Sequence, residues 1–162
     1  MTFTGRTAAV TAAAGALMLL TPSISHADST SFVNWGSRKC LEIENSSSRN
    51  GARAQQWDCN GQDGAAWEWE WVGPGRQYWI RNAHNGKCLE VADSRRDNGA
   101  PVQLWDCSKT ARGQLWLKPP AGSWEITNYG SGKALEVENS STRNGARVQQ
   151  WTWTGADGQK WY

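Results

Sequence analysis

The sequence predicts an all-β domain made of three copies of one four-stranded unit. The run Lys-Cys-Leu-Glu-Ile at residues 39–43 recurs with small changes at 87–91 and 133–137, so the copies are 48 and 46 residues apart. Each copy is followed at the same offset by Asn-Gly-Ala and then by Gln-x-Trp. A repeat of this length indicates one supersecondary unit that buries its apolar face against its neighbours. Because three identical open edges would aggregate, we expect closure around a pseudo-threefold axis.

Each unit is expected to hold four strands in one order, in repeats at about residues 32–77, 78–123 and 124–162. The first strand opens at Phe32, Ile80 or Ile126, and the second is the Cys-Leu-Glu-Val run. The third carries Gln-x-Trp, and the fourth starts near a tryptophan at position 67, 116 or 161. Between the second and third strands, an Asn-Gly dipeptide predicts a hairpin turn, because both residues accept a positive φ. The three units predict about twelve strands, and no stretch predicts a long helix.

Residues 1–27 lie outside the repeat pattern and have the features of a secretory signal peptide. Arg6 is their only charge, and residues 8–20 are mostly apolar but too short to cross a bilayer. The run Ser25-His26-Ala27 fits the small-x-small rule for cleavage. The alternative, an uncleaved membrane anchor, is disfavoured by this length and by Pro22. We therefore expect a secreted, extracellular chain in which residues 28–162 form one domain.

The composition narrows the range of partners. The formal net charge of +2 falls to +1 when Arg6 is removed, and there is no basic run or acidic tail. Neither nucleic acid nor an anionic membrane is therefore an expected partner. Twelve tryptophans in 162 residues are far more than usual. We expect some of them at the surface, where aromatic rings often stack on a ligand, and others in a β-rich core that is short of Leu and Ile.

The four cysteines support the alignment of the repeats. Cys40 and Cys59 are 19 residues apart, as are Cys88 and Cys107, whereas the third copy has alanine and tryptophan at the matching positions. Joint loss of both partners is what a bonded pair predicts, so of three connectivities we expect Cys40–Cys59 and Cys88–Cys107. Each bridge would close a loop of about 20 residues and stabilise the fold by roughly 3 kcal/mol. A metal site is disfavoured because His84 is the one histidine after residue 27. We expect neither a metal nor a cofactor.

Placing Cys40 directly opposite Cys59 in an antiparallel hairpin sets an expected register. In this register Glu42 faces Trp57 and Glu44 faces Gln55, with matching pairs in the other copies. Side chains alternate along a strand, so the cysteines, the acid, the amide and the indole share an outer face. Leu41, Ile43 and Ala54 share the face toward the core. Gln56 and Gln150 also fall on this inner face, where the second copy has Leu104, and the pattern does not account for them.

The outer face therefore carries a carboxylate, an amide and an indole three times. This set suits a sugar ring: a carboxylate accepts charge-assisted hydrogen bonds from hydroxyls, an amide donates and accepts, and an indole covers the C–H face. The alternative is a solvated acid beside a structural tryptophan. Recurrence at fixed offsets in all copies favours the functional interpretation.

The order Cys-Leu-Glu-Val, Asn-Gly and Gln-x-Trp, in three tandem copies over about residues 32–162, resembles the ricin B-type lectin family, which includes the family 13 carbohydrate-binding modules. The resemblance implies a β-trefoil, a six-stranded barrel capped by three hairpins, with one potential sugar site in each repeat. In this family the carboxylate follows the cysteine by two residues, and the stacking aromatic closes the first Gln-x-Trp. On this chain the positions are Glu42, Gln55 and Trp57; Glu90, Gln103 and Trp105; and Glu136, Gln149 and Trp151.

The sequence departs from the family pattern just before the fourth strand. The family usually has Asn-Gln there to complete the sugar hydrogen bonds, followed by a core tryptophan. This chain has glycine in place of the asparagine in every copy. It keeps the glutamine as Gln114 and Gln159, which we expect at the sugar sites, but has Ala65 in the first copy. We therefore expect the first copy to be the most impaired.

The resemblance implies a secreted carbohydrate-binding protein without catalytic activity, with up to three weak sites for galactose- or xylan-type glycans. Family relatives are commonly fused to hydrolases, so we expect this single domain to act alone or with a secreted hydrolase as partner. The alternative is a trefoil scaffold for protein interaction or protease inhibition. Such an inhibitor needs one protruding loop, and only residues 95–97 and an insertion near Arg112 break the similarity of the loops. An enzyme is disfavoured because no nucleophilic triad, metal cluster or phosphate loop is found.

Overall fold

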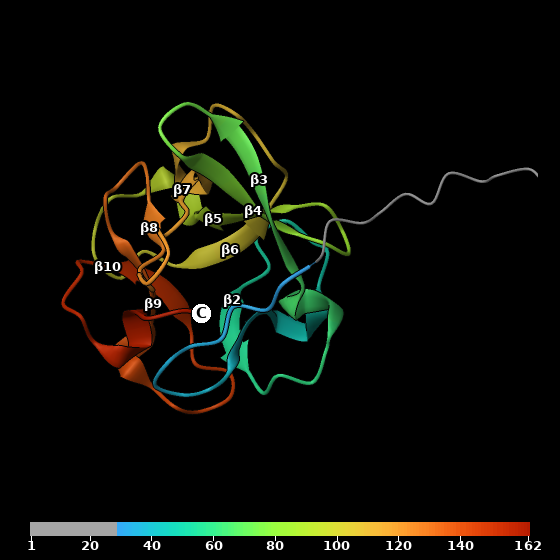
Figure 1. The fold of residues 1–162 in the computed structure, drawn as a ribbon. Coiled ribbons are helices and arrows are strands. Elements are labelled where there is room, and N and C mark those ends of the chain that lie inside the picture. Colours follow the sequence, from blue (N-terminus) through green and yellow to red (C-terminus); the bar gives the residue numbers. More distant parts are fainter. Residues whose placement is uncertain (1–28) are drawn as a thin grey trace, which may run out of the picture.

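The computed structural model describes residues 29–162, and the expected signal peptide lies outside this range. The described residues form ten strands and six short 3₁₀ helices, arranged as three similar groups around a central axis (Figure 1). The strands are β1 (Cys40–Ile43), β2 (Ala54–Trp57), β3 (Trp67–Gly73), β4 (Gln77–Asn82), β5 (Cys88–Val91), β6 (Val102–Trp105), β7 (Trp116–Leu117), β8 (Thr127–Asn128), β9 (Ala134–Val137) and β10 (Val148–Trp151). The 3₁₀ helices are η1 (Glu44–Ser46), η2 (Asp63–Ala65), η3 (Ala92–Ser94), η4 (Arg112–Gln114), η5 (Glu138–Ser140) and η6 (Asp157–Gln159).

The fold is a β-trefoil, as the resemblance implies. Each repeat contributes one hairpin, β1–β2, β5–β6 or β9–β10, and all pairings are antiparallel. The other two of the twelve expected strands are reduced to isolated bridges where the two ends of the domain meet. There Asn34 pairs with Trp161, while Thr30 pairs with Trp67 of β3 in the first repeat. The first and third repeats are thus joined directly, which closes the ring.

The three hairpins meet at the central axis through their second strands. Isolated bridges join Gln55 to Arg147, Arg53 to Gln103, and Pro101 to Gln149, so β2, β6 and β10 contact one another in pairs. The residues that follow the cysteine motif in each repeat are therefore held against a neighbouring repeat. This arrangement gives every hairpin the same pattern of backbone neighbours at the axis.

The expected register of the hairpins is wrong by two residues. Cys40 pairs with Trp57 and Glu42 pairs with Gln55, and the other two hairpins have the matching register. The expected pairing of Glu42 with Trp57 and of Glu44 with Gln55 does not form. Cys59 lies beyond the end of β2 and reaches back to Cys40, so the disulfide is not a directly opposed pair. A shift by two keeps every side chain on its face, because the side-chain period of a strand is also two.

The Asn-Gly dipeptides do not form the expected two-residue turns. Residues 44–53 join β1 to β2 and begin with η1, so the hairpin loop is long. Gly51 has a φ of +83°, whereas Asn50 is not among the residues with positive φ. Positive φ falls instead on Asn45 and Ser46 within η1. Asn50 is used for a contact with the next repeat, described below.

Both expected disulfides are confirmed. Cys40 is bonded to Cys59 and Cys88 to Cys107, with Cα–Cα distances of 5.2 and 5.1 Å. In the third repeat, the matching alanine is fully buried and the matching Trp153 is 39% exposed. That repeat therefore holds its hairpin without a crosslink. Among residues 29–162, the structure has no helix that is long and apolar enough to span a membrane.

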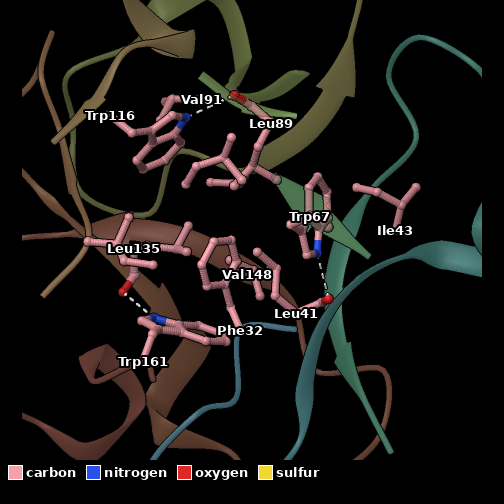
Figure 2. Close-up of a cluster of buried hydrophobic side chains, with 14 of the residues drawn as sticks. Phe32, Leu41, Ile43, Trp67, Leu89, Val91, Trp116, Leu135, Val148 and Trp161 are labelled. Carbon is pink, nitrogen blue, oxygen red and sulfur yellow. Dashed lines mark hydrogen bonds between the residues drawn. The ribbon is translucent and has the colours of Figure 1, made fainter. Parts of the chain in front are cut away.

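The core is threefold in composition. Leu41, Leu89 and Leu135 are fully buried around the axis, and so are their strand neighbours Ile43, Val91 and Val137. A tryptophan at the start of the fourth strand of each repeat closes the core, and its indole N–H donates to a leucine carbonyl (Figure 2). These bonds are 3.0 Å from Trp67 to Leu41, 2.9 Å from Trp116 to Leu89 and 3.0 Å from Trp161 to Leu135. The expected division into buried and exposed tryptophans is confirmed, since Trp71 is 65% exposed.

The inner-face glutamines hold the repeats together. The Gln56 amide donates to the carbonyls of Ser141 and Arg143 at 2.7 and 2.9 Å and accepts from the Ser37 hydroxyl at 2.6 Å. Gln150 repeats this arrangement toward the second repeat, with carbonyls of Arg95 and Asp97 as its acceptors. These amides satisfy loop carbonyls of the adjoining repeat. The second repeat has Leu104 instead, which joins the apolar core.

Candidate functional site

Each repeat carries a carboxylate–amide pair at the centre of its hairpin. Gln55 Nε2 donates to Glu42 Oε2 at 3.2 Å, and Gln103 donates to Glu90 and Gln149 to Glu136 at 3.2 and 3.1 Å. The register explains the contact, because the acid and the amide are direct cross-strand partners. The amide is thus oriented with its nitrogen on the acid and its oxygen away from it.

The acids do not point into solvent as expected from the strand pattern. Glu42, Glu90 and Glu136 are only 6, 7 and 8% exposed, and Gln55 and Gln149 are also buried. The 3₁₀ helix before the fourth strand packs against the cysteine-motif strand, as η2 does against β1. The indoles are exposed, at 38% for Trp57, 42% for Trp105 and 38% for Trp151. The site is therefore an exposed indole beside a recessed acid, which is how a directional polar group is combined with an apolar platform.

The later glutamine of the second and third repeats lies beneath the acid. Gln114 Nε2 donates to Glu90 Oε2 and Gln159 Nε2 to Glu136 Oε2, both at 2.6 Å. Each Nε2 also donates to a backbone carbonyl, and each Oε1 accepts from a backbone N–H. Both glutamines are 0% exposed. They position the carboxylate and the loop, and their polar atoms are already bonded within the protein.

In the first repeat, a glutamine at a different position bonds the loop but not the acid. Ala65 is too short to reach the acid, and Gln62, three residues earlier, bonds the loop instead. Its Oε1 accepts from the Asn60 amide at 3.1 Å, and its Nε2 donates to the Asp58 carbonyl at 3.2 Å. Gln62, Asn60 and Asn45 line a depression of about 230 Å³ together with the expected site residues of this repeat. Comparison of the copies does not reveal Gln62 and Asn60, because both other copies have different residue types there, and Asn45 recurs only as Asn139 of the third copy.

Each exposed indole rests against the Asn-Gly turn of a neighbouring repeat. A Cβ atom on Gly145 would lie 3.8 Å from the Trp57 ring, and on Gly51 or Gly99 it would lie 3.7 Å from Trp105 or Trp151. The preceding asparagine fixes the turn: Asn144 Nδ2 donates to Asp58 at 2.8 Å, and Asn50 Nδ2 donates to Asp106 at 2.8 Å. Each site is therefore completed by the preceding repeat, and that of the first repeat by the third.

Charged contacts reinforce two of these three junctions. Lys39 pairs with Asp58 and Lys87 with Asp106, next to the asparagine of the incoming turn. The hydrogen bond from the lysine, and then that from the asparagine, hold the pKa of Asp58 and of Asp106 below their ordinary value. In the third repeat, Thr152 replaces the aspartate, and it donates to Asn98 through its amide and its hydroxyl.

The second repeat differs from the others on the axial side of its site. In the first and third repeats, Arg53 and Arg147 donate to the Gln55 and Gln149 oxygens at 3.1 and 3.0 Å. The second repeat has Pro101 there, and Gln103 is partly exposed. Its amide oxygen therefore has no arginine donor.

Within residues 29–162, no group of three or more His, Cys, Asp and Glu side chains could hold a metal ion. The carboxylates of the site are spread over three separate hairpins. What the geometry provides is hydrogen bonding and stacking in each repeat.

Comparison with protein families identifies the class. A family model for the ricin-type beta-trefoil lectin domain matches residues 28–161, so the chain belongs to this family. Lectins are carbohydrate-binding proteins, and membership of the family supports carbohydrate binding by this chain. A search of curated proteins found no match.

Solved structures agree with this assignment. ThreeFoil, a designed 3-fold symmetric protein, is 34% identical with a TM-score of 0.78, over 83% of this chain and 96% of that one. An exo-β-1,3-galactanase from Clostridium thermocellum is 28% identical with a TM-score of 0.78, and the match covers 85% of this chain but 30% of that one. The C-half of the earthworm R-type lectin, solved with GalNAc, is 15% identical with a TM-score of 0.68, over 84% of this chain and 97% of that one. At this identity the earthworm protein supports the fold alone.

Proposed function

We propose that this chain is a secreted, non-catalytic lectin that binds galactose- or xylan-type glycans through up to three shallow sites, one in each repeat. The observation that carries the proposal is the recurrence of a recessed, amide-bonded glutamate beside an exposed tryptophan in all three hairpins. Stacking supplies an apolar contact with the ring, and the acid supplies a charge-assisted acceptor for a hydroxyl. The proposed sugar contacts are the acid, the amide and the indole of each repeat. Gln114 and Gln159 support the acid from below.

The individual sites are expected to be weak because each is open and wet. Three sites on one rigid body raise retention on a polymer through effective concentration, without any new contact. Two disulfides support secretion, since such bonds persist in oxidising compartments. The galactanase similarity makes β-1,3-linked galactan the first polymer to test, and a secreted hydrolase is the kind of partner that would profit from such retention.

The test measures retention of residues 28–162 on immobilised galactan and xylan. Trp57→Ala, Trp105→Ala and Trp151→Ala are compared singly and combined, with Trp71→Ala as a control because this exposed indole lies outside the sites. We expect the triple variant to lose retention and the control to keep it. Equal retention of the triple variant and the wild type would refute the proposed platforms.

A further inference from the structure

We infer that the first repeat is the principal sugar site and that Gln62 is a ligand-binding residue of it. This inference rests on the proposed function and adds a rank order and a new contact residue. It reverses the order that the missing glutamine suggests from sequence alone. Three internally related sites allow each step to be checked against two references in the same molecule.

The carboxylate of the first repeat has fewer hydrogen-bond donors within the protein than those of the other two repeats. In the second and third repeats, each oxygen of the acid accepts an N–H from a glutamine: Oε1 and Oε2 of Glu90 from Gln103 and Gln114, and those of Glu136 in the same way. In the first repeat only Oε2 of Glu42 accepts such a bond. Within residues 29–162, Glu42 Oε1 has no hydrogen-bond partner, although the residue is only 6% exposed.

Glu42 Oε1 requires a hydrogen-bond donor from outside the protein. A recessed carboxylate oxygen without a hydrogen-bond donor is costly, and a hydrogen bond to a charged group is stronger than one between neutral groups. Glu42 Oε1 is not sealed from solvent, because it is not among the inaccessible unpaired atoms. It therefore accepts a hydrogen bond from outside, and the adjoining depression is where the donor would sit.

The Gln62 amide has an N–H group that the protein does not use. Gln114 and Gln159 use both N–H groups within the protein, one on the acid and one on a backbone carbonyl. Gln62 donates only to the Asp58 carbonyl within the described residues, and it is partly exposed. Its second N–H is free for a ligand. The first repeat thus offers an acceptor, a donor and an indole around one depression.

Glu42 Oε1 and the Gln62 amide together suit a ligand hydroxyl that donates to Glu42 Oε1. The same hydroxyl, or the adjacent one on the ring, accepts a hydrogen bond from Gln62. Adjacent hydroxyls of a pyranose ring meet this demand, with the ring lying on Trp57. The depression of about 230 Å³ is smaller than the roughly 300–1,000 Å³ of pockets for larger ligands. The site therefore holds one terminal ring, and any further sugar residue extends into solvent.

The test resolves the three sites in one titration. The protein is labelled with 5-fluorotryptophan, and the ¹⁹F resonances of Trp57, Trp105 and Trp151 are assigned by single Trp→Phe variants. Methyl β-galactoside and methyl β-xyloside are the probes. One added charge-assisted bond corresponds to about a tenfold difference in affinity. We expect Trp57 to respond at about tenfold lower ligand concentration than the other two, and Trp71 not to respond.

Two swap variants test the residues. Gln62→Ala with Ala65→Gln gives the first repeat the arrangement of the third, and should bring the Trp57 affinity down to that of Trp151. The reverse swap, Ala156→Gln with Gln159→Ala, should strengthen the third site. Equal affinities at the three indoles in the wild type, or unchanged affinities in both swaps, would overturn the inference and leave the proposed function intact. No response of any of the three indoles to either sugar would overturn both.

Discussion

Replacing Gln56 by leucine tests the inner-face amide, which looks like a mismatch in the sequence. The second repeat has a buried leucine at this position, so hydrophobicity alone predicts that Gln56→Leu stabilises the fold. The structure predicts the opposite. The side chain makes three hydrogen bonds, two of them to loop carbonyls of another repeat, and each contributes about 1 kcal/mol. One or two more buried carbons return roughly 1 kcal/mol. The variant should therefore lose about 2 kcal/mol of unfolding free energy.

The assay is urea unfolding followed by tryptophan fluorescence, with the free energy extrapolated from the midpoint and slope. A second variant, Gln56→Leu with Ser37→Asn, copies the pair found in the second repeat. It should recover part of the loss, because the Ser37 hydroxyl has lost its acceptor on Gln56 in the single variant, and because Asn85 accepts the Lys87 amide at 3.0 Å whereas Ser37 accepts the Lys39 amide at 3.3 Å. The carbonyls of Ser141 and Arg143 still lack their donors, so recovery should be incomplete. A single variant as stable as the wild type would show that the amide contributes nothing to the joining of the repeats.

Two further predictions concern the junctions between repeats and the departure from the family motif. Because the pKa of Asp58 and of Asp106 is held below the ordinary 3.8, their stabilisation is complete above that value and is lost as the pH falls through the lower folded-state pKa. The urea concentration at the unfolding midpoint should decrease as the pH is lowered below about 4. The double variant Asp58→Asn with Asp106→Asn should show a smaller decrease; the same pH dependence as in the wild type would contradict the role given to these two carboxylates. Gly113→Asn restores the family residue, yet a Cβ there would lie 2.5 Å from the Val91 carbonyl oxygen. Overpacking of this kind costs about 1–3 kcal/mol, measured as a lower thermal midpoint. Gly73→Asn is the control, because φ is not positive there and an added Cβ would meet only the flexible end of the Gln77 side chain, at 3.3 Å; it should lower the midpoint less, and equal midpoints for the two variants would refute the clash.

The parts of the fold that could be predicted from the sequence are those that recur. The strand order and both disulfides follow from comparing the copies with one another, because an alignment inside one chain separates shared from variable positions. The predicted register is wrong because it assumes that the bonded cysteines are directly opposed, whereas Cys59 lies beyond the end of β2. The assignment of side chains to the two faces of the hairpin is still correct, because the register differs by an even number of residues.

The burial of the acids could not be predicted from strand periodicity. A period of two assigns a side chain to a face, but it does not say what covers that face. Here a 3₁₀ helix from the same repeat packs on the cysteine-motif strand. Gln62 was missed for a related reason: it bonds the same loop as Gln114 and Gln159 from a position three residues away. A contact that is kept in space but made from a different position in the repeat is not detected when the copies are compared position by position.

The indole of each proposed sugar site lies against the Asn-Gly turn of another repeat, so the sites depend on the closure of the trefoil. Trp57 lies against Gly145 of the third repeat, Trp105 against Gly51 of the first and Trp151 against Gly99 of the second. Every platform therefore needs the turn of a neighbour, and the three contacts form a closed cycle. A glycine is required at the turn because φ is near +80°, and a side chain would also reach the ring. A single repeat would lack one wall of its own proposed site, so the proposed sugar binding requires the closed trefoil and not only a separate hairpin.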